Sequence, residues 1–344
     1  MVDENKNLTI SAWLLLITFL VAAMIIVGGL TRLTDSGLSI TKWDLFVGII
    51  PPLSSAGWEN AFSLYKKIPE YKLLNSSMTL NEFKTIFWWE YVHRLLGRLI
   101  GILYIIPLIY FTIKKRIHGK NLFFLYFIFF LIFLQGVIGW YMVKSGLTER
   151  TDVSHYRLSL HLTLAFIIFI LLIWNYFIHL QKKNFTSEKR LPYYLPEIFC
   201  FLIILQISIG AFVSGLDAGK IYQSWPLMNN SYFPDDSNIK NLFSIKAMEN
   251  PSLVQFLHRN LAYLILFFYL VIFFITFKND EYKYLKKLVL LILLIIFIQI
   301  FLGILTILSG AQIYLASMHQ IGSIFLVTFS TILLFKNSKL TNSF

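Results

Sequence analysis

Residues 87–112 read FWWEYVHRLLGRLIGILYIIPLIYFT, an apolar run that carries a few ionisable side chains close to its start. Crossing a bilayer takes about 20 mainly apolar residues. Further runs of this kind occur at 12–30, 122–143, 157–178, 195–214, 254–277, 287–308 and 314–335. They are continuous rather than alternating, which in lipid favours helices over a closed barrel. We therefore expect an all-α membrane protein with eight transmembrane helices.

The composition supports a membrane protein and gives its orientation. Of the 344 residues, 57% are hydrophobic and only 14% are charged, which is too much apolar surface for a soluble domain to bury. The net charge of +12 would suggest a nucleic-acid partner for a soluble protein, but here the basic residues cluster in short loops, so no nucleic-acid partner is expected. Short basic loops stay on the cytoplasmic side, which places both termini in the cytoplasm. The basic residues after every second run are Lys114, Lys115, Arg116, Lys120, Lys182, Lys183, Lys189, Arg190, Lys278, Lys283, Lys286, Lys287, Lys336 and Lys339.

The chain repeats itself after about half its length. A glutamine, a glycine four residues later and a Ser-Gly pair recur in three odd-numbered runs, the middle copy being shortened. These residues are Gln135, Gly139 and Ser145-Gly146; Gln206, Gly210 and Ser214-Gly215; and Gln299, Gly303 and Ser309-Gly310. A histidine recurs in every even-numbered run: His93, His161, His258 and His319. The repeat predicts two parallel bundles of four helices, one in residues 1–194 and the other in residues 195–344.

The four histidines are expected at similar depth, about one or two turns into their helices and near the outer face. A single histidine in a membrane helix can simply hydrogen-bond a neighbouring helix. Four in a duplicated frame favour paired ligands that face each other across each bundle. Zinc would need four ligands, and neither half offers thiolates or a further suitable histidine. Two imidazoles suit the axial positions of a haem iron, so His93 with His161, and His258 with His319, are predicted to hold one haem each.

Three other histidines and the single cysteine fall outside this pattern. His118 and His179 are expected to be solvated or interfacial. His155 is expected in an exposed outer loop, from which it could reach a propionate. Cys200 is expected to pack within its helix, since one thiol cannot form an intramolecular disulfide.

Arginines accompany the histidines, and the two halves differ beside them. Arg94, Arg98 and Arg259 could pair with haem propionates, although anchoring to lipid headgroups is an alternative, above all for Arg98. Glu90 lies three residues before His93, on the same helical face, whereas Gln255 takes that place before His258. An ionisable group at this depth is costly and indicates function. An ion pair between Glu90 and Arg94 is the structural alternative. The contrast favours chemistry in the first half and a permanent cofactor in the second.

The outer segments also differ. Segment 33–86 is aromatic and amphipathic, which predicts that it lies along the membrane interface as a lid over a pocket open to lipid. Its marked residues, with the two tryptophans that follow it, are Trp43, Pro51-Pro52, Trp58, Phe62, Tyr65 and Trp88-Trp89. The corresponding segment 216–253 is shorter and more polar, and it contains Trp225-Pro226 and Tyr232.

At these residues the chain resembles the haem A synthase family in its proteobacterial and mitochondrial form. The resemblance covers essentially the whole chain. It rests on Gly28-Gly-Leu-Thr-Arg-Leu-Thr-Asp-Ser-Gly-Leu-Ser39, Trp43 with Pro51-Pro52, Glu82-Phe-Lys-Thr-Ile-Phe-Trp-Trp-Glu90-Tyr-Val-His93-Arg-Leu-Leu-Gly-Arg98, the Gln-x-x-x-Gly runs, Asp217-Ala-Gly219, Tyr222, Trp225-Pro-Leu-Met228 and His258-Arg259. Some relatives carry a cysteine pair in the first outer segment. This chain has none there, so the resemblance does not support a thiol-based step.

The resemblance implies oxidation of the ring methyl of haem O to a formyl group, which gives haem A for terminal oxidases. It implies that His93 and His161 serve the substrate haem, that Glu90 is the important carboxylate, and that His258 and His319 hold a haem b. It also implies a bacterial inner-membrane protein with its haem sites towards the extracytoplasmic face. The farnesyl transferase that makes haem O is a candidate partner.

Two other function classes remain open from the sequence. A di-haem cytochrome that carries electrons between quinol and a partner would explain the paired histidines equally well. It requires neither Glu90 beside one haem nor the aromatic outer segment. A transporter with parallel repeats would place polar residues near the bilayer midplane, whereas the ionisable residues here lie near the outer face. The electron acceptor and the oligomeric state stay undetermined, with a homo-oligomer as one option.

Overall fold

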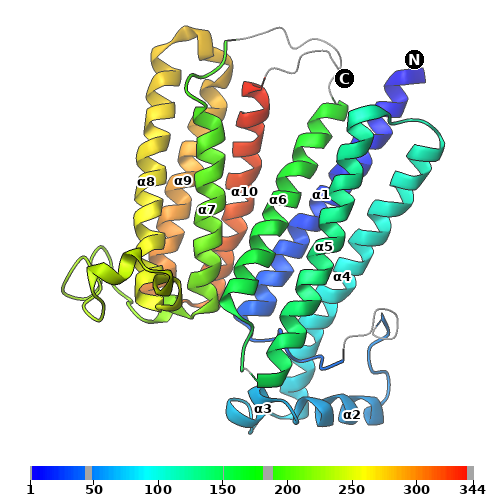
Figure 1. The fold of residues 1–344 in the computed structure, drawn as a ribbon, viewed down its shortest axis with the longest axis vertical. Helices are drawn as coiled ribbons and strands as arrows, with labels where there is room; N and C mark the ends of the chain where they lie inside the picture. Colours follow the sequence, from blue (N-terminus) through cyan, green and yellow to red (C-terminus); the bar gives the residue numbers. More distant parts are fainter. Residues whose placement is uncertain (1, 43–48, 150, 181–188, 339–344) are drawn as a thin grey trace.

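The computed structural model describes residues 2–42, 49–149, 151–180 and 189–338, and these residues form helices joined by loops (Figure 1). The long helices are α1 (Val2–Leu33), α4 (Leu80–Ile113), α5 (Gly119–Glu149), α6 (His155–Leu180), α7 (Leu195–Gly215), α8 (Pro251–Lys278), α9 (Lys286–Leu308) and α10 (Ile313–Asn337). The short ones are α2 (Ser55–Tyr65), α3 (Pro69–Leu73), η2 (Ala218–Lys220), η3 (Ile239–Phe243), η4 (Ile245–Glu249) and η5 (Asp280–Leu285). Each of the eight long helices is apolar and long enough to cross a membrane, which confirms the predicted fold class.

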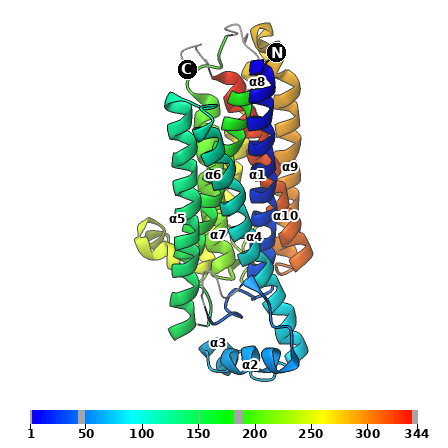
Figure 2. The ribbon, with the colours of Figure 1, turned by 90° about the vertical axis from the view of Figure 1, so that its right-hand side faces the viewer.

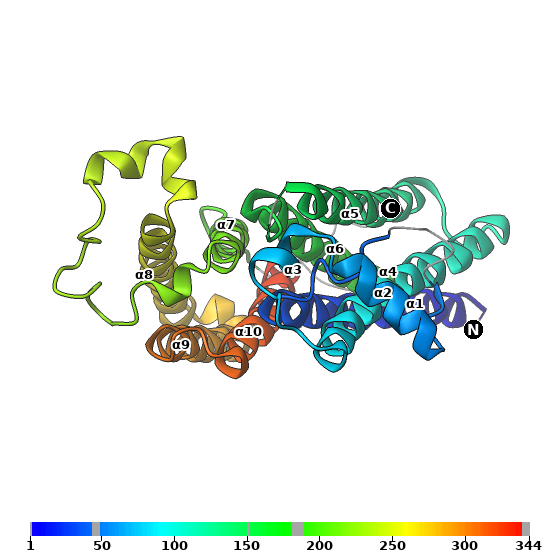
Figure 3. The ribbon, with the colours of Figure 1, turned by 90° about the horizontal axis from the view of Figure 1, so that it is seen from below.

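The long helices stand in two bundles side by side (Figures 1 and 3). The first contains α1, α4, α5 and α6, and the second contains α7 to α10. The bundles meet where α1 and α6 pack against α7 and α10. The start of α1 and the end of α10 lie at one end of the molecule, and α2, α3 and the segment between α7 and α8 cover the opposite end (Figure 1).

Helix α4 begins seven residues before the predicted run, for a local reason. The hydroxyl of Thr79 accepts a hydrogen bond from the backbone N–H of Glu82, and the Glu82 carboxylate accepts one from the backbone N–H of Thr79 at 2.8 Å. This capping box satisfies two backbone donors at the helix start. His93 therefore lies 13 residues into α4 rather than one or two turns. With 34 residues, α4 is about 51 Å long and extends well beyond a hydrocarbon core of about 30 Å.

The extension of α4 carries the lid. Helices α2 and α3 lie across the end of the first bundle (Figure 2). The ring of Phe62 stacks on that of Phe83 with 5.0 Å between centroids, and Trp58 meets Phe87 edge-on at 4.9 Å. Helix α2 is thus held by aromatic packing on α4. Trp43, which we expected to contribute, lies outside the described residues.

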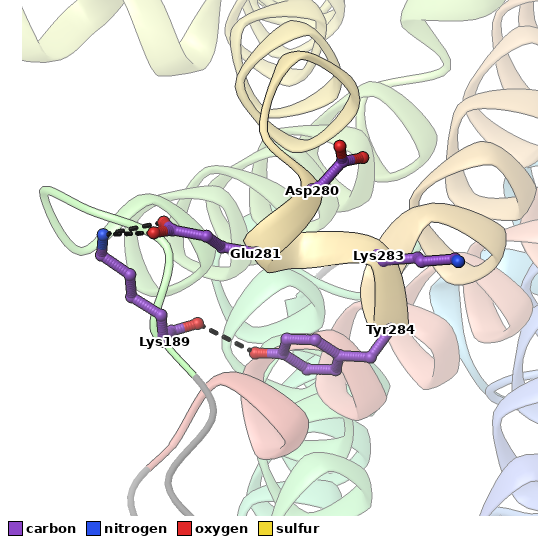
Figure 4. Close-up of a pocket in the computed structure, with 5 residues that line it drawn as sticks. All are labelled: Lys189, Asp280, Glu281, Lys283 and Tyr284. Carbon is purple, nitrogen blue, oxygen red and sulfur yellow. Dashed lines mark hydrogen bonds and ion pairs between the residues drawn. The ribbon is translucent and has the colours of Figure 1, made fainter.

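The opposite end of the molecule has a hollow of about 540 Å³ beside η5 (Figure 4). It is lined by Lys189, Asp280, Glu281, Lys283 and Tyr284. Lys189 pairs with Glu281 at 2.7 Å, and Tyr284 donates to the Lys189 carbonyl oxygen at 3.2 Å. These are solvent-exposed contacts worth at most about 1 kcal/mol. They hold the segment before α7 against η5, and the functional site lies elsewhere.

Candidate haem and active site

Each of the four predicted histidines packs against a glycine of the preceding odd-numbered transmembrane span. A Cβ added at the glycine would lie 3.0–3.2 Å from the imidazole, closer than ordinary contacts allow. The pairs are Gly28 with His93, Gly139 with His161, Gly210 with His258 and Gly303 with His319. The repeated glycines therefore make room for the imidazoles, in addition to letting the helices approach closely.

The repeated glutamines fix the same helices. Gln135 donates to the backbone oxygen of His161 at 2.9 Å, and Gln206 donates to that of His258 at 3.0 Å. Gln299 lies against Gly322 of α10, where a Cβ would overlap its amide. The Gln-x-x-x-Gly pattern thus joins α5, α7 and α9 each to the next helix, close to its histidine.

All four histidines line one continuous cavity of about 1550 Å³. Small-molecule sites usually enclose about 300–1000 Å³, so this volume exceeds what one such ligand needs. The cavity also contains the predicted Glu90, Arg94, Arg98 and Arg259, together with Gln255. The structure therefore brings every predicted site residue to one connected space.

The histidine pair of the second half has the spacing of two axial ligands. The rings of His258 and His319 have centroids 6.4 Å apart and planes inclined by 79°. Two metal–imidazole bonds of about 2 Å each, plus the half-widths of two rings, span about 6 Å. The Nδ1 atoms of His161, His258 and His319 are buried without a hydrogen-bond partner. The spacing of His258 and His319 fits a haem iron.

Glu90 is buried, 2% exposed, and fully engaged. Its Oε1 atom pairs with Arg94 at 2.5 Å, and its Oε2 atom accepts hydrogen bonds from the Ser39 hydroxyl at 2.7 Å and the Ile40 N–H at 2.8 Å. Arg94 also donates to the carbonyl oxygens of Ile40 and Lys42. The ion pair considered as an alternative is therefore present, and Arg94 is directed at Glu90 and this backbone.

The second half repeats this arrangement without the carboxylate. Gln255, 1% exposed, donates to the Tyr222 carbonyl oxygen at 3.0 Å. Arg259 donates to the same oxygen at 3.2 Å and to the Leu227 carbonyl oxygen at 3.4 Å. In both halves, the arginine next to the histidine and the residue four positions before it bind the segment that follows a helix, α1 in the first half and α7 in the second. The pair is charged in the first half and contains a neutral amide in the second.

The remaining predicted positions are mostly as expected. His118 is exposed, and the Cys200 thiol donates to the Ser330 carbonyl oxygen within the second bundle. His179 is not solvated: it is only 7% exposed, because helix packing covers this end of α6. Its Nδ1 atom lies 2.8 Å from the Asn175 carbonyl oxygen. His155 is the first residue of α6 rather than a loop residue, and its ring packs on Phe212.

Sequence reasoning missed Glu70 of α3. It is 4% exposed and lines the cavity; Tyr65 donates to its Oε1 atom at 3.2 Å, and its Oε2 atom is buried without a partner. Burial, helped by the nearby Glu90 carboxylate, raises the pKa of Glu70 to about 8. No local pattern marks this residue, because its burial depends on how α2 and α3 fold over the bundle.

Known proteins match the chain along nearly its whole length. Residues 11–331 match the model of the COX15-CtaA family, described as cytochrome oxidase assembly proteins. A haem A synthase of Pelagibacter ubique is 51% identical over 340 residues, which cover 98% of each chain. One of Flavobacterium psychrophilum is 42% identical over 344 residues, covering 97% of this chain and all of the relative, and one of Rhizobium etli is 40% identical over 328 residues, covering 95% and 89%. With both the fold and the site in agreement, the chain belongs to the COX15-CtaA family of cytochrome oxidase assembly proteins.

Proposed function

We propose that this chain is a haem A synthase, which oxidises the ring methyl of haem O to a formyl group. The observation that carries the proposal is one cavity with four glycine-backed histidines and a buried carboxylate beside the histidine of the first half only. The relatives named haem A synthase, at 40–51% identity over most of their length, support it.

We assign different tasks to the two halves. Residues 1–194 take haem O between His93 and His161, beside Glu90. Residues 195–344 keep a haem b between His258 and His319, which would supply one-electron redox chemistry. The neutral Gln255 supports this division, because a resident cofactor needs no proton acceptor beside it.

Glu90 has a specific task in this proposal. Converting a methyl group and one water to a formyl group releases four protons and four electrons, so the substrate carbon becomes electron-poor on the way. A carboxylate fixed at the cavity wall stabilises developing positive charge and can accept a proton. Ser39, Ile40 and Arg94 hold the two oxygens in place, which removes the cost of reorienting them during the reaction.

The orientation completes the proposal. The basic loops after the even-numbered spans support an orientation with the start of α1 and the end of α10 in the cytoplasm of a bacterial cell. The cavity end, with the lid, then lies at the extracytoplasmic face of the inner membrane. Direct transfer of haem O from the farnesyl transferase would keep this insoluble substrate out of water.

The test is expression of the chain in a host that makes haem O but lacks haem A synthase and terminal oxidase. Extracted haems are identified by mass spectrometry. We expect haem A, or its hydroxylated intermediate, only when the chain is expressed. Purified protein that contains two haems but yields neither product would instead indicate a di-haem electron carrier.

A further inference from the structure

The cavity of the first half reaches the lipid-facing surface between α4 and α5, the two helices farthest from the second bundle (Figure 1). On these two helices, five apolar side chains that line the cavity are more than a third exposed. They are Leu95, Leu99 and Ile102 of α4, exposed by 38, 42 and 53%, and Phe133 and Val137 of α5, exposed by 62 and 39%. Other atoms of the described protein cover these side chains only in part, as an opening between the two helices requires.

Two glycines lie in this part of the cavity wall. A Cβ added to Gly101 of α4 or to Gly136 of α5 would meet no atom within 4 Å. They differ in this from Gly139, whose Cβ would meet the imidazole of His161 at 3.1 Å. Gly101 and Gly136 therefore serve neither helix contact nor imidazole packing, and they leave space open.

The second half closes the same place. At the spacing that relates His93 to His258, Gly101 corresponds to Leu266; at the spacing that relates Gln135 to Gln299, Gly136 corresponds to Ile300. Both larger side chains pack against the hydrophobic core. The residues of α8 and α9 that line the cavity are all buried or half-buried. The two halves thus share their histidines but differ in the cavity wall, where glycines of the first half correspond to Leu266 and Ile300 of the second.

We propose that the opening between α4 and α5 is a lateral portal through which haem O enters from the bilayer, and that its isoprenoid tail lies between these helices. This rests on the proposed function of the first half. The portal walls are aliphatic and aromatic, as a farnesyl chain requires. A tail bound there is removed from water, and compared with lipid it loses no polar contacts. Two polar atoms of residues that line the same cavity are available to the macrocycle. They are the Oε2 atom of Glu70, 4% exposed, and the Nδ1 atom of His161, and neither has a hydrogen-bond partner.

The portal is tested by giving the first half the residues of the second. The double variant Gly101→Leu/Gly136→Ile is purified as the full chain, with haem b bound in its second half. Its first half is titrated with haem O and with haem B, which has the same macrocycle without the isoprenoid tail. We expect haem O affinity to fall at least ten-fold and haem B affinity to change less than two-fold. Unchanged haem O affinity, or equal losses for both haems, would overturn the position of the tail between these helices, and an unchanged association rate of haem O would overturn the portal.

Two further variants keep the test independent of folding defects. Phe130→Trp enlarges a lipid-facing side chain of α5, 54% exposed, that does not line the cavity, and it should leave both affinities unchanged. Leu266→Gly opens the closed wall, and haem exchange from the second half should become at least five-fold faster. Exchange at the unaltered rate would contradict the argument. Since binding and exchange are measured without turnover, a wild-type chain that makes no haem A would refute the proposed function and leave these readouts intact.

Discussion

Glu90 and Gln255 show how one residue separates two otherwise similar sites. Both side chains are buried, both lie three residues before a histidine, and both help an arginine to hold the segment after the preceding span. Holding that segment therefore does not require a carboxylate. The charge of Glu90 is additional to the structural task, which is why we assign it to chemistry.

The variant Glu90→Gln separates the two tasks. The amide keeps the size of the side chain, and its oxygen can still accept hydrogen bonds from Ser39 and Ile40. Arg94 loses its charged partner but keeps the carbonyl oxygens of Ile40 and Lys42, so the protein should accumulate with both haem sites filled. Haem A formation should fall at least 100-fold, in the range for loss of an acid–base or charge-stabilising group. Pyridine haemochrome spectra and mass spectrometry of extracted haems measure the two quantities. Gln255→Glu is the matched control in the second half, and normal haem A output from Glu90→Gln would remove Glu90 from the mechanism.

The glycines behind the histidines allow a prediction for each half. Gly210→Val would place a Cβ 3.0 Å from the His258 imidazole and add two methyl groups, so the ring must shift from the position in which we propose that it binds haem. The second half should lose its haem, halving the Soret absorbance per chain when the first half is loaded with haem B. Gly139→Val should do the same to the first half. Full haem content in Gly210→Val would show that the imidazole is not held by this contact.

At the scale of elements, the helices of the lid, α2 and α3, bury an ionisable side chain, Glu70. Helices α2 and α3 cover the cavity end of the first bundle and bury Glu70 and Tyr65, whose side chains both contact the half-buried Asn75. A carboxyl group whose pKa is raised from 4.5 to about 8 is held mainly in its neutral form near pH 7. The stability of the lid on the bundle should therefore depend on pH.

The sign follows from linkage. Because the folded-state pKa of Glu70 is above its unfolded value, its contribution is fully present below about pH 4.5 and is lost as the pH rises through about 8. Within this window, stability should fall by up to about 1.4 kcal/mol per pH unit. Glu70→Gln stays neutral, so its thermal unfolding midpoint should exceed that of the wild type at pH 8–9 and vary less with pH. Parallel pH profiles for the two proteins would contradict the assignment.

At the scale of the whole molecule, the two bundles are joined by close contact and by polar links across it. Gln320 of α10 donates to the Ile25 carbonyl oxygen of α1 at 2.8 Å, and Gly29 provides the space for its amide. At the end covered by α2 and α3, Arg32 of α1 pairs with Asp35 and donates to the Ser214 carbonyl oxygen of α7 at 2.8 Å. The halves therefore meet in a specific register rather than through apolar packing alone.

A double-mutant cycle tests this junction. Gly29→Val would overlap the amide of Gln320, which must leave its hydrogen bond, so the free energy of unfolding should fall by about 1–3 kcal/mol. Adding Gln320→Ala removes the overlapping amide and should restore part of the loss. Thermal unfolding in detergent measures both changes, and strictly additive effects would show that the two residues do not interact.

The sequence by itself determined the eight helices, because a chain in lipid must satisfy its backbone within each span. The repeat spacing also predicted the four histidines and the Glu90–Gln255 contrast, and the cavity that the structure forms contains all of them. Only the tertiary structure decided what each glycine does: the repeat marks Gly139 but not that it faces the imidazole of His161, and no pattern marks Gly101, which faces open space. The burial of Glu70 and His179 and the opening between α4 and α5 were likewise decided there. These features depend on which surfaces of distant helices meet, and no local pattern carries that information.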